Sequence, residues 1–571
     1  MCIRDSLEND GDQSFDLTRA MSACLDLPDK DYEWIQLSGA WAREREIKTR
    51  KLEQGIQSVG SLRGNSSHNH NPFIALKRQS ADEFQGDVIG MSLVYSGNFL
   101  MQAEVDTYDV TRILMGIHPM GFQWHLEPGE SFQTPEAIIT FSEDGLNGMS
   151  QTFHKLFRTR LARGYWRDKE RPILINNWEA TYFDFNTEKL LDIAREAKKD
   201  GIEMLVMDDG WFGKRNSDNC SLGDWFVNED KINGGLKHLV EEVKKIGLKF
   251  GIWFEPEMIS PDSELYKVHP EWAIHIEGRK ATQIRQQYVL DLSNPEVIDY
   301  AYESVAKILR SVSIDYVKWD MNRELSDLGS SYLDKDSQQE LFHRYVLGLY
   351  KMQERLITEF PDLLLENCSG GGARFDPGML YYSPQIWCSD DTDAVERLEI
   401  QEGTALIYPL STMGAHVSVC PNHSVGRITP FETRGHVALA GTFGYELDIT
   451  KLPEEEHKII KEQTEMYHKY NDLVREGDYY RIASFSENGH YDCYMEVAKD
   501  KSEALVTYVQ VRGMTNNKSR KLKLRGLDPK AIYQLEGTEE SYSGEILMKG
   551  GYLFKDFWGD AVSRLYHFMK K

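Results

Sequence analysis

Acidic and aromatic residues recur in this sequence where apolar runs end. Residues 314–320, IDYVKWD, close on Lys318, Trp319 and Asp320, three residues that a buried strand normally excludes. A lysine two positions before an acid is poorly explained by packing, because burying an unpaired ammonium group is costly. Five other apolar runs close in the same way, on Trp178; on Asp208 and Asp209; on Trp253, Glu255 and Glu257; on Cys368; and on Trp387, Asp390, Asp391 and Asp393.

Such a combination of side chains suits carbohydrate chemistry. Tryptophan faces can cover the apolar side of a sugar ring, and two carboxyl groups can act as nucleophile and general acid. Each residue alone has a plainer explanation, since a strand-terminal Trp often packs and a strand-terminal Asp often caps the next helix. Asp393, directly before a predicted helix, is expected to be such a cap. The recurrence over six runs favours a common site.

Eight apolar runs alternate with amphipathic stretches between about residues 173 and 420. Alternation of this kind indicates a parallel sheet, and eight units in roughly 250 residues match a (β/α)₈ barrel, whose active site lies at the carboxyl ends of its strands. A doubly wound open sheet is the alternative, weakened because no GxGxxG follows the first run. The predicted strands, which place Asp320 on the fifth and Asp390 on the seventh, are 172–178, 202–211, 250–258, 286–292, 314–320, 362–368, 384–391 and 414–420.

Both flanks of the predicted barrel read as β structure, with short apolar runs separated by Gly, Asn and Asp. The expected organisation is an α/β protein with an N-terminal β-sandwich and linker over 1–165, the barrel over 166–474 and a C-terminal antiparallel β domain over 475–571. The chain opens in mid-strand, so we expect a truncated first domain and interpret "MCIRDS" as foreign sequence.

Composition excludes several classes of partner. The 571 residues carry a formal net charge of −25, which argues against nucleic acid, and no apolar stretch approaches the ~20 residues that span a bilayer. No signal peptide is visible, and seven scattered cysteines fit a reducing compartment, so a cytoplasmic location is predicted. Neither HExxH nor CxxC occurs, "HNH" at 68–70 is interpreted as loop polarity, and no metal or cofactor is expected.

A glycine-rich segment, CSGGGARFDPG at 368–378, follows one of the runs. It lacks the GK[ST] ending of a phosphate cradle. Close approach of the backbone to a ligand is the better explanation, because glycine has no Cβ to block it.

Five motifs together resemble the α-galactosidases of glycoside hydrolase family 36: DDGWF, GIWFEPEM, YVKWDMNR, ENCSGGGARFDPGMLYYSPQIWCSDDTDAVERLEIQ and MGAHVSVCPNH. The resemblance runs from about residue 70 to the C-terminus. It implies a barrel between a β-sandwich and a C-terminal antiparallel domain, no cofactor, and a homo-oligomer, a tetramer in the family. Because the longer first domain of the family contributes to tetramer formation, the short first domain of this chain is expected to affect its oligomeric state.

The resemblance also implies roles for single residues. Asp320 would be the nucleophile and Asp390 the general acid and base. The substrate-binding residues that it implies are Asp208 and Asp209 on sugar hydroxyls, Lys318 and Arg285 beside the nucleophile, Trp178, Trp253 and Trp387 as walls, and Cys368 with the backbone of Gly370 or Gly371 at the 2-hydroxyl.

The expected reaction is retaining hydrolysis of terminal α-D-galactosyl residues from oligosaccharides of the melibiose and raffinose type. Glu255 or Glu257 could be the acid instead of Asp390, although an E-P-E stretch more plausibly orients its neighbours. The same set of residues is also compatible with an α-N-acetylgalactosaminidase, a galactosyl transglycosylase or a non-catalytic carbohydrate-binding barrel.

Overall fold

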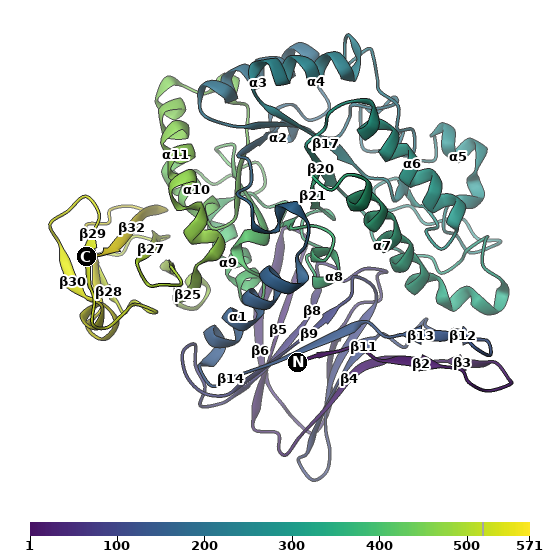
Figure 1. Ribbon diagram of the computed structural model, residues 1–571, viewed down its shortest axis with the longest axis horizontal. Helices are drawn as coiled ribbons and strands as arrows, with labels where there is room; N and C mark the ends of the chain where they lie inside the picture. Colours follow the sequence, from purple (N-terminus) through teal and green to yellow (C-terminus); the bar gives the residue numbers. More distant parts are fainter. Residues whose placement is uncertain (517–518) are drawn as a thin grey trace.

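Eight parallel strands form a closed barrel in the computed structural model, which describes residues 1–516 and 519–571 (Figure 1). Leu174 of the first strand pairs with Gly444 of the last, so the sheet has no open edge. The predicted (β/α)₈ fold is confirmed, and the open-sheet alternative is wrong. The strands are β15 (Leu174–Asn176), β16 (Met204–Met207), β17 (Lys249–Phe254), β20 (Tyr316–Trp319), β21 (Leu364–Asn367), β22 (Gln385–Trp387), β23 (Met413–Ser418) and β24 (Thr442–Glu446).

One of the eight predicted barrel strands is wrong. Residues 286–292 contain only β19 (Tyr288–Val289), which pairs antiparallel with β18 (Met258–Ile259) outside the barrel. The missing strand is β24, beyond the predicted set. A short buried hairpin and a barrel strand have the same apolar composition, so periodicity could not separate them. Asp320 therefore follows the fourth strand and Asp390 the sixth, not the fifth and seventh.

The helices around the barrel begin and end at residues suited to those positions. Asp393 caps the helix after β22, accepting hydrogen bonds from the backbone N–H groups of Val395 and Glu396, as predicted. Pro295 opens the helix before β20. The longer helices are α3 (Thr187–Lys199), α4 (Gly235–Ile246), α6 (Pro295–Ser311), α7 (Leu341–Glu359), α9 (Ala394–Ala405), α10 (Phe431–Ala438) and α11 (Glu454–Glu476), and the shorter ones are α2 (Trp178–Thr181), α5 (Glu264–Val268) and α8 (Pro377–Leu380).

Two antiparallel sheets form the N-terminal β-sandwich, below the barrel in Figure 1. Their inward side chains, among them Trp34, Phe73 and Met101, are fully buried. One sheet has the order β1 (Cys2–Ile3), β14 (Glu136–Ser142), β9 (Val88–Val94), β8 (His70–Arg78), β5 (Tyr32–Ala40) and β6 (Arg43–Lys51). The other has β4 (Met21–Leu27), β11 (Thr111–Ile117), β10 (Phe99–Val105) and β7 (Gly55–Gly60). The two-stranded pairs β3 (Phe15–Leu17) with β12 (Trp124–Leu126) and β2 (Ser6–Glu8) with β13 (Ser131–Gln133) extend from it, and α1 (Gly145–Leu156) leads to the barrel.

The hairpin of β5 and β6 joins the sandwich to the barrel through the start of β6. Arg45, which is 3% exposed, donates to the carbonyl oxygens of Gly372 and Cys388 and to the Thr404 hydroxyl. Gly403 lies against this segment so closely that a Cβ there would be 1.9 Å from the Arg45 carbonyl oxygen. These buried contacts hold the hairpin at the mouth of the barrel.

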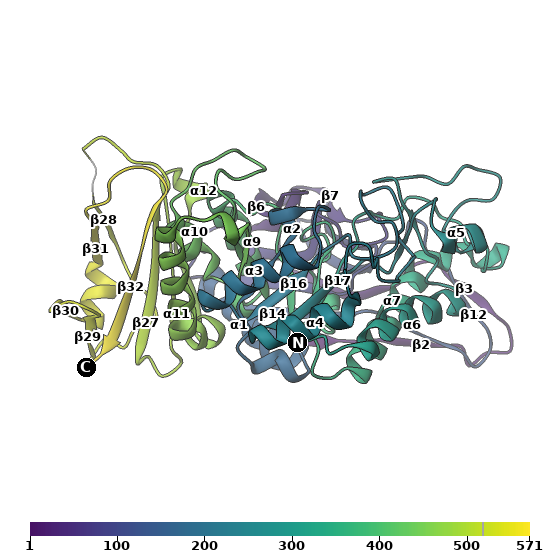
Figure 2. The same ribbon diagram turned by 90° about the horizontal axis from the view of Figure 1, so that it is seen from above.

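The C-terminal domain packs against α10 and α11 at the far end of the molecule from the loops of α5 (Figure 2). Its six-stranded sheet has the order β25 (Asp478–Ala483), β26 (Tyr491–Val497), β27 (Glu503–Gln510), β32 (Val562–Lys570), β29 (Ile532–Leu535) and β30 (Ser541–Ser543), with α12 (Phe485–Asn488) between β25 and β26. A separate pair, β28 (Ser519–Leu522) and β31 (Tyr552–Lys555), lies over it. This antiparallel domain confirms the prediction. No helix among the described residues is long and apolar enough to cross a membrane.

Candidate active site

A cavity of about 1050 Å³ opens at the carboxyl ends of the barrel strands. This volume lies slightly above the roughly 300–1,000 Å³ typical of ligand pockets, so the cavity can hold more than one sugar ring. The cavity lining includes Trp178, Asp208, Asp209, Trp253, Arg285, Lys318, Asp320, Cys368, Gly370, Trp387 and Asp390. Of the predicted site residues, only Gly371 is absent from the lining.

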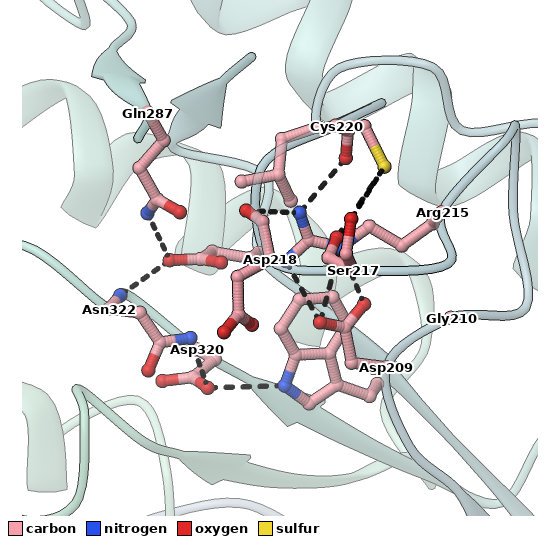
Figure 3. A network of polar contacts seen from close by, with 12 residues as sticks. Asp209, Gly210, Arg215, Ser217, Asp218, Cys220, Gln287, Asp320 and Asn322 are labelled. Carbon is pink, nitrogen blue, oxygen red and sulfur yellow. Dashed lines mark hydrogen bonds and ion pairs between the residues drawn. The ribbon is translucent and has the colours of Figure 1, made fainter. Parts of the chain in front are cut away.

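Asp320, directly after β20, is held by four hydrogen-bond donors, and Figure 3 draws the two that reach Oδ2. Its Oδ2 accepts from the Trp253 indole at 3.1 Å and from the Asn322 amide at 2.7 Å. Its Oδ1 accepts from the backbone N–H groups of Met321 at 2.8 Å and Gly370 at 3.2 Å. Burial opposes ionisation, but the charge of Lys318 and the hydrogen bonds of Cys368, Asn322 and the Met321 N–H outweigh it and lower the pKa of Asp320. Asp320 is thus an oriented, ionised carboxylate.

Lys318 lies two positions before Asp320, on β20, and is paired rather than isolated. Its Nζ is 3.0 Å from Asp208 Oδ2, and both side chains are less than a tenth exposed. Burial would lower the pKa of Lys318, but the charges of Asp208, Glu446 and Asp320 raise it well above its usual value. A permanent ammonium group therefore lies between the acids that end β16 and β20.

Asp390, which follows β22, is in a different environment. Indole N–H groups donate to both of its oxygens, Trp41 to Oδ2 at 2.9 Å and Trp387 to Oδ1 at 3.2 Å. Burial, with the negative charges of Asp320 and Glu44, raises the pKa of Asp390 despite the opposing effect of Trp41 and Lys318. A carboxyl group with a raised pKa can hold a proton for a leaving group.

The glycine-rich segment brings backbone between these two acids. Gly370, with a left-handed φ of 48°, turns its N–H towards Asp320 and its carbonyl oxygen towards His68 Nε2 at 2.6 Å. Gly371, with φ of 80°, lies behind the cavity, where a Cβ would be 2.8 Å from the Asp390 nitrogen. Burial and the charge of Asp320 raise the pKa of Cys368 well above its usual value, which keeps the thiol neutral.

Asp209 belongs to a network of polar contacts on the other side of the cavity (Figure 3), and Arg285 joins this network by donating to Asp218 Oδ1 at 3.4 Å. Arg215 donates to both oxygens of Asp209, and its remaining nitrogen holds the carbonyl oxygens of Asp218 and Cys220. Arg285, with a left-handed φ of 51°, donates to Asn322 Oδ1 at 2.9 Å. Arg285 therefore reaches Asp320 through Asn322.

Neither alternative acid from the E-P-E stretch lines the cavity. Glu257 is fully buried and accepts hydrogen bonds from Trp319, Tyr345 and both terminal nitrogens of Arg374. Glu255 is also fully buried and bonds the Asn322 backbone N–H and the Gln287 amide. The orienting role expected for this stretch fits both positions.

Several lining residues were missed by the sequence reasoning. Trp41 comes from the sandwich hairpin, 349 positions before Asp390 in the chain, and no local pattern connects the two. His68, interpreted as loop polarity, lines the cavity. Glu179, His423 and Glu446 also line the cavity. Burial raises the pKa of Glu179 to about 7, and the Glu179 carboxyl group, 3.6 Å from His423 Nδ1, raises the pKa of His423. Glu446 could have been noticed as the acid that ends an apolar run, had β24 been recognised.

Comparison with protein families covers most of the chain. Residues 131–477 match the melibiase family, residues 2–127 match the glycosyl hydrolase family 36 N-terminal domain, and residues 491–568 match the C-terminal domain of that family.

Individual relatives agree with the family matches. Alpha-galactosidase AgaA of Geobacillus stearothermophilus is 54% identical over 559 residues, which are 98% of this chain and 76% of AgaA. The crystal structure of an AgaA variant with raffinose matches at a TM-score of 0.98 and 52% identity, and that of another with stachyose at 0.97 and 52%. Each match covers 99% of this chain and 79% of the AgaA chain.

Proposed function

The chain belongs to glycosyl hydrolase family 36 and is an α-galactosidase, and from this premise we propose that its cavity cleaves terminal α-galactosides with retention of configuration, using Asp320 as nucleophile and Asp390 as acid and base. The observation that carries the proposal is the opposite tuning of two carboxyl groups in one cavity. Asp320 has a lowered pKa and Asp390 a raised pKa. Two carboxyl groups whose pKa values are driven apart have the assignments that glycoside hydrolysis requires.

In the first step an Asp320 oxygen attacks the anomeric carbon while Asp390 gives its proton to the departing glycosidic oxygen. Asp320 becomes neutral in the covalent galactosyl-enzyme, and Asp390 becomes the base that removes a proton from water. That water then displaces Asp320 and restores both groups. Trp41 and Trp387 stabilise the ionised Asp390 of the second step, because each indole N–H donates to one of its oxygens.

The remaining lining residues suit recognition of the galactosyl ring. Asp208, Asp209 and Lys318 present two carboxylates and an ammonium group to hydroxyls, and Cys368 with the Gly370 backbone is proposed to border the 2-position. Raffinose and stachyose, with which variants of AgaA have been crystallised, are the proposed kind of substrate. The cavity volume, which exceeds the need of one ring, supports oligosaccharides of this type.

Release of nitrophenol from its α-galactoside tests the activity, with the α-glucoside and the α-N-acetylgalactosaminide as controls. We expect turnover of the galactoside alone, and NMR spectra of early product should contain α-galactose. A preference for the N-acetylated sugar would contradict the proposed border at the 2-position. Initial release of β-galactose would contradict retention, and galactose binding without turnover would indicate a non-catalytic barrel.

Location and assembly follow as further proposals. A cytoplasmic location is supported by the seven cysteines, all unpaired. A homo-oligomer is proposed by analogy with the family, and light scattering coupled to size-exclusion chromatography would measure it.

A further inference from the structure

Glu255 has a buried carboxyl group of which only one oxygen accepts hydrogen bonds. It follows β17, has no exposed surface and does not line the cavity. Its Oε1 accepts from the Asn322 backbone N–H and, at 2.8 Å, from the Gln287 amide. Its Oε2 is buried with no hydrogen-bond partner among the described residues. Leaving such an atom unpaired is costly, so its place here calls for an explanation.

Glu255 holds Asn322, one of the residues that orient Asp320. Asn322 is fixed through its backbone by Glu255, and its side-chain amide donates to Asp320 Oδ2 at 2.7 Å. Figure 3 shows this chain of contacts running from Gln287 through the intervening carboxyl group to Asn322 and Asp320. Displacing the Asn322 backbone would move the donor and release one oxygen of the carboxylate.

We propose that Glu255 is a positioning residue for Asp320, acting through Asn322, and that its own proton controls how much negative charge lies beside the nucleophile. The inference rests on the proposed role of Asp320. Its second part concerns a group that never touches the substrate, since Glu255 lies behind the cavity wall.

The charges around Glu255 explain how its carboxyl group can gain or lose a proton near neutral pH. Burial and the negative charge of Asp320 raise the pKa of Glu255 to about 7, against the opposing charges of Arg285 and Arg215. Below that pH Glu255 is neutral, and Asp320 is the only anion of the pair. Above it both groups are ionised, and the pair carries a second negative charge beside the reacting carbon.

Glu257 provides a matched control, two positions away on the same segment. It is equally buried, but its carboxylate accepts hydrogen bonds from Trp319, Tyr345 and Arg374 and none from Asn322. A general effect of removing a buried carboxylate would appear at both positions. An effect on Asp320 would appear only at Glu255.

The test compares E255A, E255Q, Q287L and E257Q in the full chain with nitrophenyl α-galactoside. E255A should lower kcat by about 10- to 100-fold with KM within about twofold, because misplacing a reacting group affects the transition state most. E255Q should restore most of that loss, and Q287L should lower kcat by a few fold. The pH profiles of wild type and E255Q should coincide in shape at acidic pH and separate above about 7.

Different results would overturn the inference. An unchanged kcat in E255A, or the same loss in E257Q with wild-type melting temperature, would show that Glu255 has no special link to Asp320. If E255A does not fold, an unchanged kcat in Q287L together with a wild-type pH profile in E255Q would also overturn the inference. D320N is measured alongside: activity there would contradict the nucleophile assignment itself, whereas an inactive D320N with a normal E255A would overturn only the positioning role of Glu255.

Discussion

The two proposed catalytic carboxyl groups lie in one cavity but are supported by different parts of the molecule. Asp320 is held entirely by barrel residues, through Trp253, Asn322 and backbone groups, and has a positive partner in Lys318. Asp390 depends on a donor from another domain, the Trp41 indole, and lies near the negative Glu44 of the same hairpin. The barrel thus supplies every hydrogen-bond donor and the positive partner of the ionised Asp320. The sandwich, in contrast, contributes a donor and a negative charge that together influence the pKa of Asp390.

The difference predicts that substitutions around Asp320, in the barrel, lower the rate for every substrate alike. Substitutions in the sandwich hairpin should change the protonation of Asp390, so their effect should depend on pH and on the leaving group. The following variants are ordered by the size of the expected effect.

Asp320→Asn should have the largest effect, with kcat falling by about 10⁴-fold or more for all α-galactosides, because the covalent step is lost. Its melting temperature should change little, and binding of galactose should persist in calorimetry. Substantial remaining activity after exclusion of wild-type contamination would remove the nucleophile assignment.

Asp390→Asn should separate substrates by leaving group. Loss of a general acid typically costs about 10²- to 10⁴-fold, so raffinose turnover should fall in that range. Galactosides with activated aryl groups need no proton and should form the galactosyl-enzyme at near wild-type rate in a stopped-flow burst. Equal losses for both kinds of substrate would contradict the acid role.

Arg45→Met should test the attachment of the hairpin. Removing the guanidinium leaves buried oxygens of Gly372, Cys388 and Thr404 without their donor, at about 1–3 kcal/mol for each unsatisfied group. We expect a lower melting temperature and a lower kcat, with a larger loss for raffinose than for the activated galactoside. Lys51→Met, at an exposed position of the same hairpin outside the cavity lining, is the control. A stable Arg45→Met variant with wild-type activity would show that the hairpin does not need this anchor.

Trp41→Phe should have the smallest effect and the most specific one. The indole N–H lowers the pKa of Asp390 against burial, so its removal should raise that pKa further. Asp390 must be protonated to act as the acid, and activity is lost as pH rises through its pKa, so the alkaline limb of kcat/KM should move to higher pH. The acid limb follows Asp320 and should stay below the usual aspartate range. An alkaline limb that moves down would contradict this account.

The barrel side was open to prediction from the sequence because its residues follow strands. Lys318 and Asp320 close one apolar run and Asp390 follows another, and the closed barrel brings such ends together. The assignment of strands was partly wrong. The buried hairpin strand at 288–289 has the apolar composition of a barrel strand, and the true barrel strand Thr442–Glu446 was not predicted.

Contributions from the sandwich could not be predicted in the same way. Trp41 and His68 reach the cavity through the packing of one domain on another, and that packing leaves no periodic signal in the sequence.

The hydrogen bonds of Glu255, within the barrel, could not be predicted either. Its partners Gln287 and Asn322 lie on two loops that meet only in the folded chain.

The anchored hairpin at 41–45 has a consequence for how this active site can diversify. Most of the residues proposed to bind galactose lie in or directly after barrel strands, among them Asp208, Lys318 and Cys368, whereas the tip of the hairpin belongs to a separate domain and Trp41 is 62% exposed. Substitutions at that tip are therefore expected to alter the surroundings of Asp390 while the residues on the barrel strands stay unchanged.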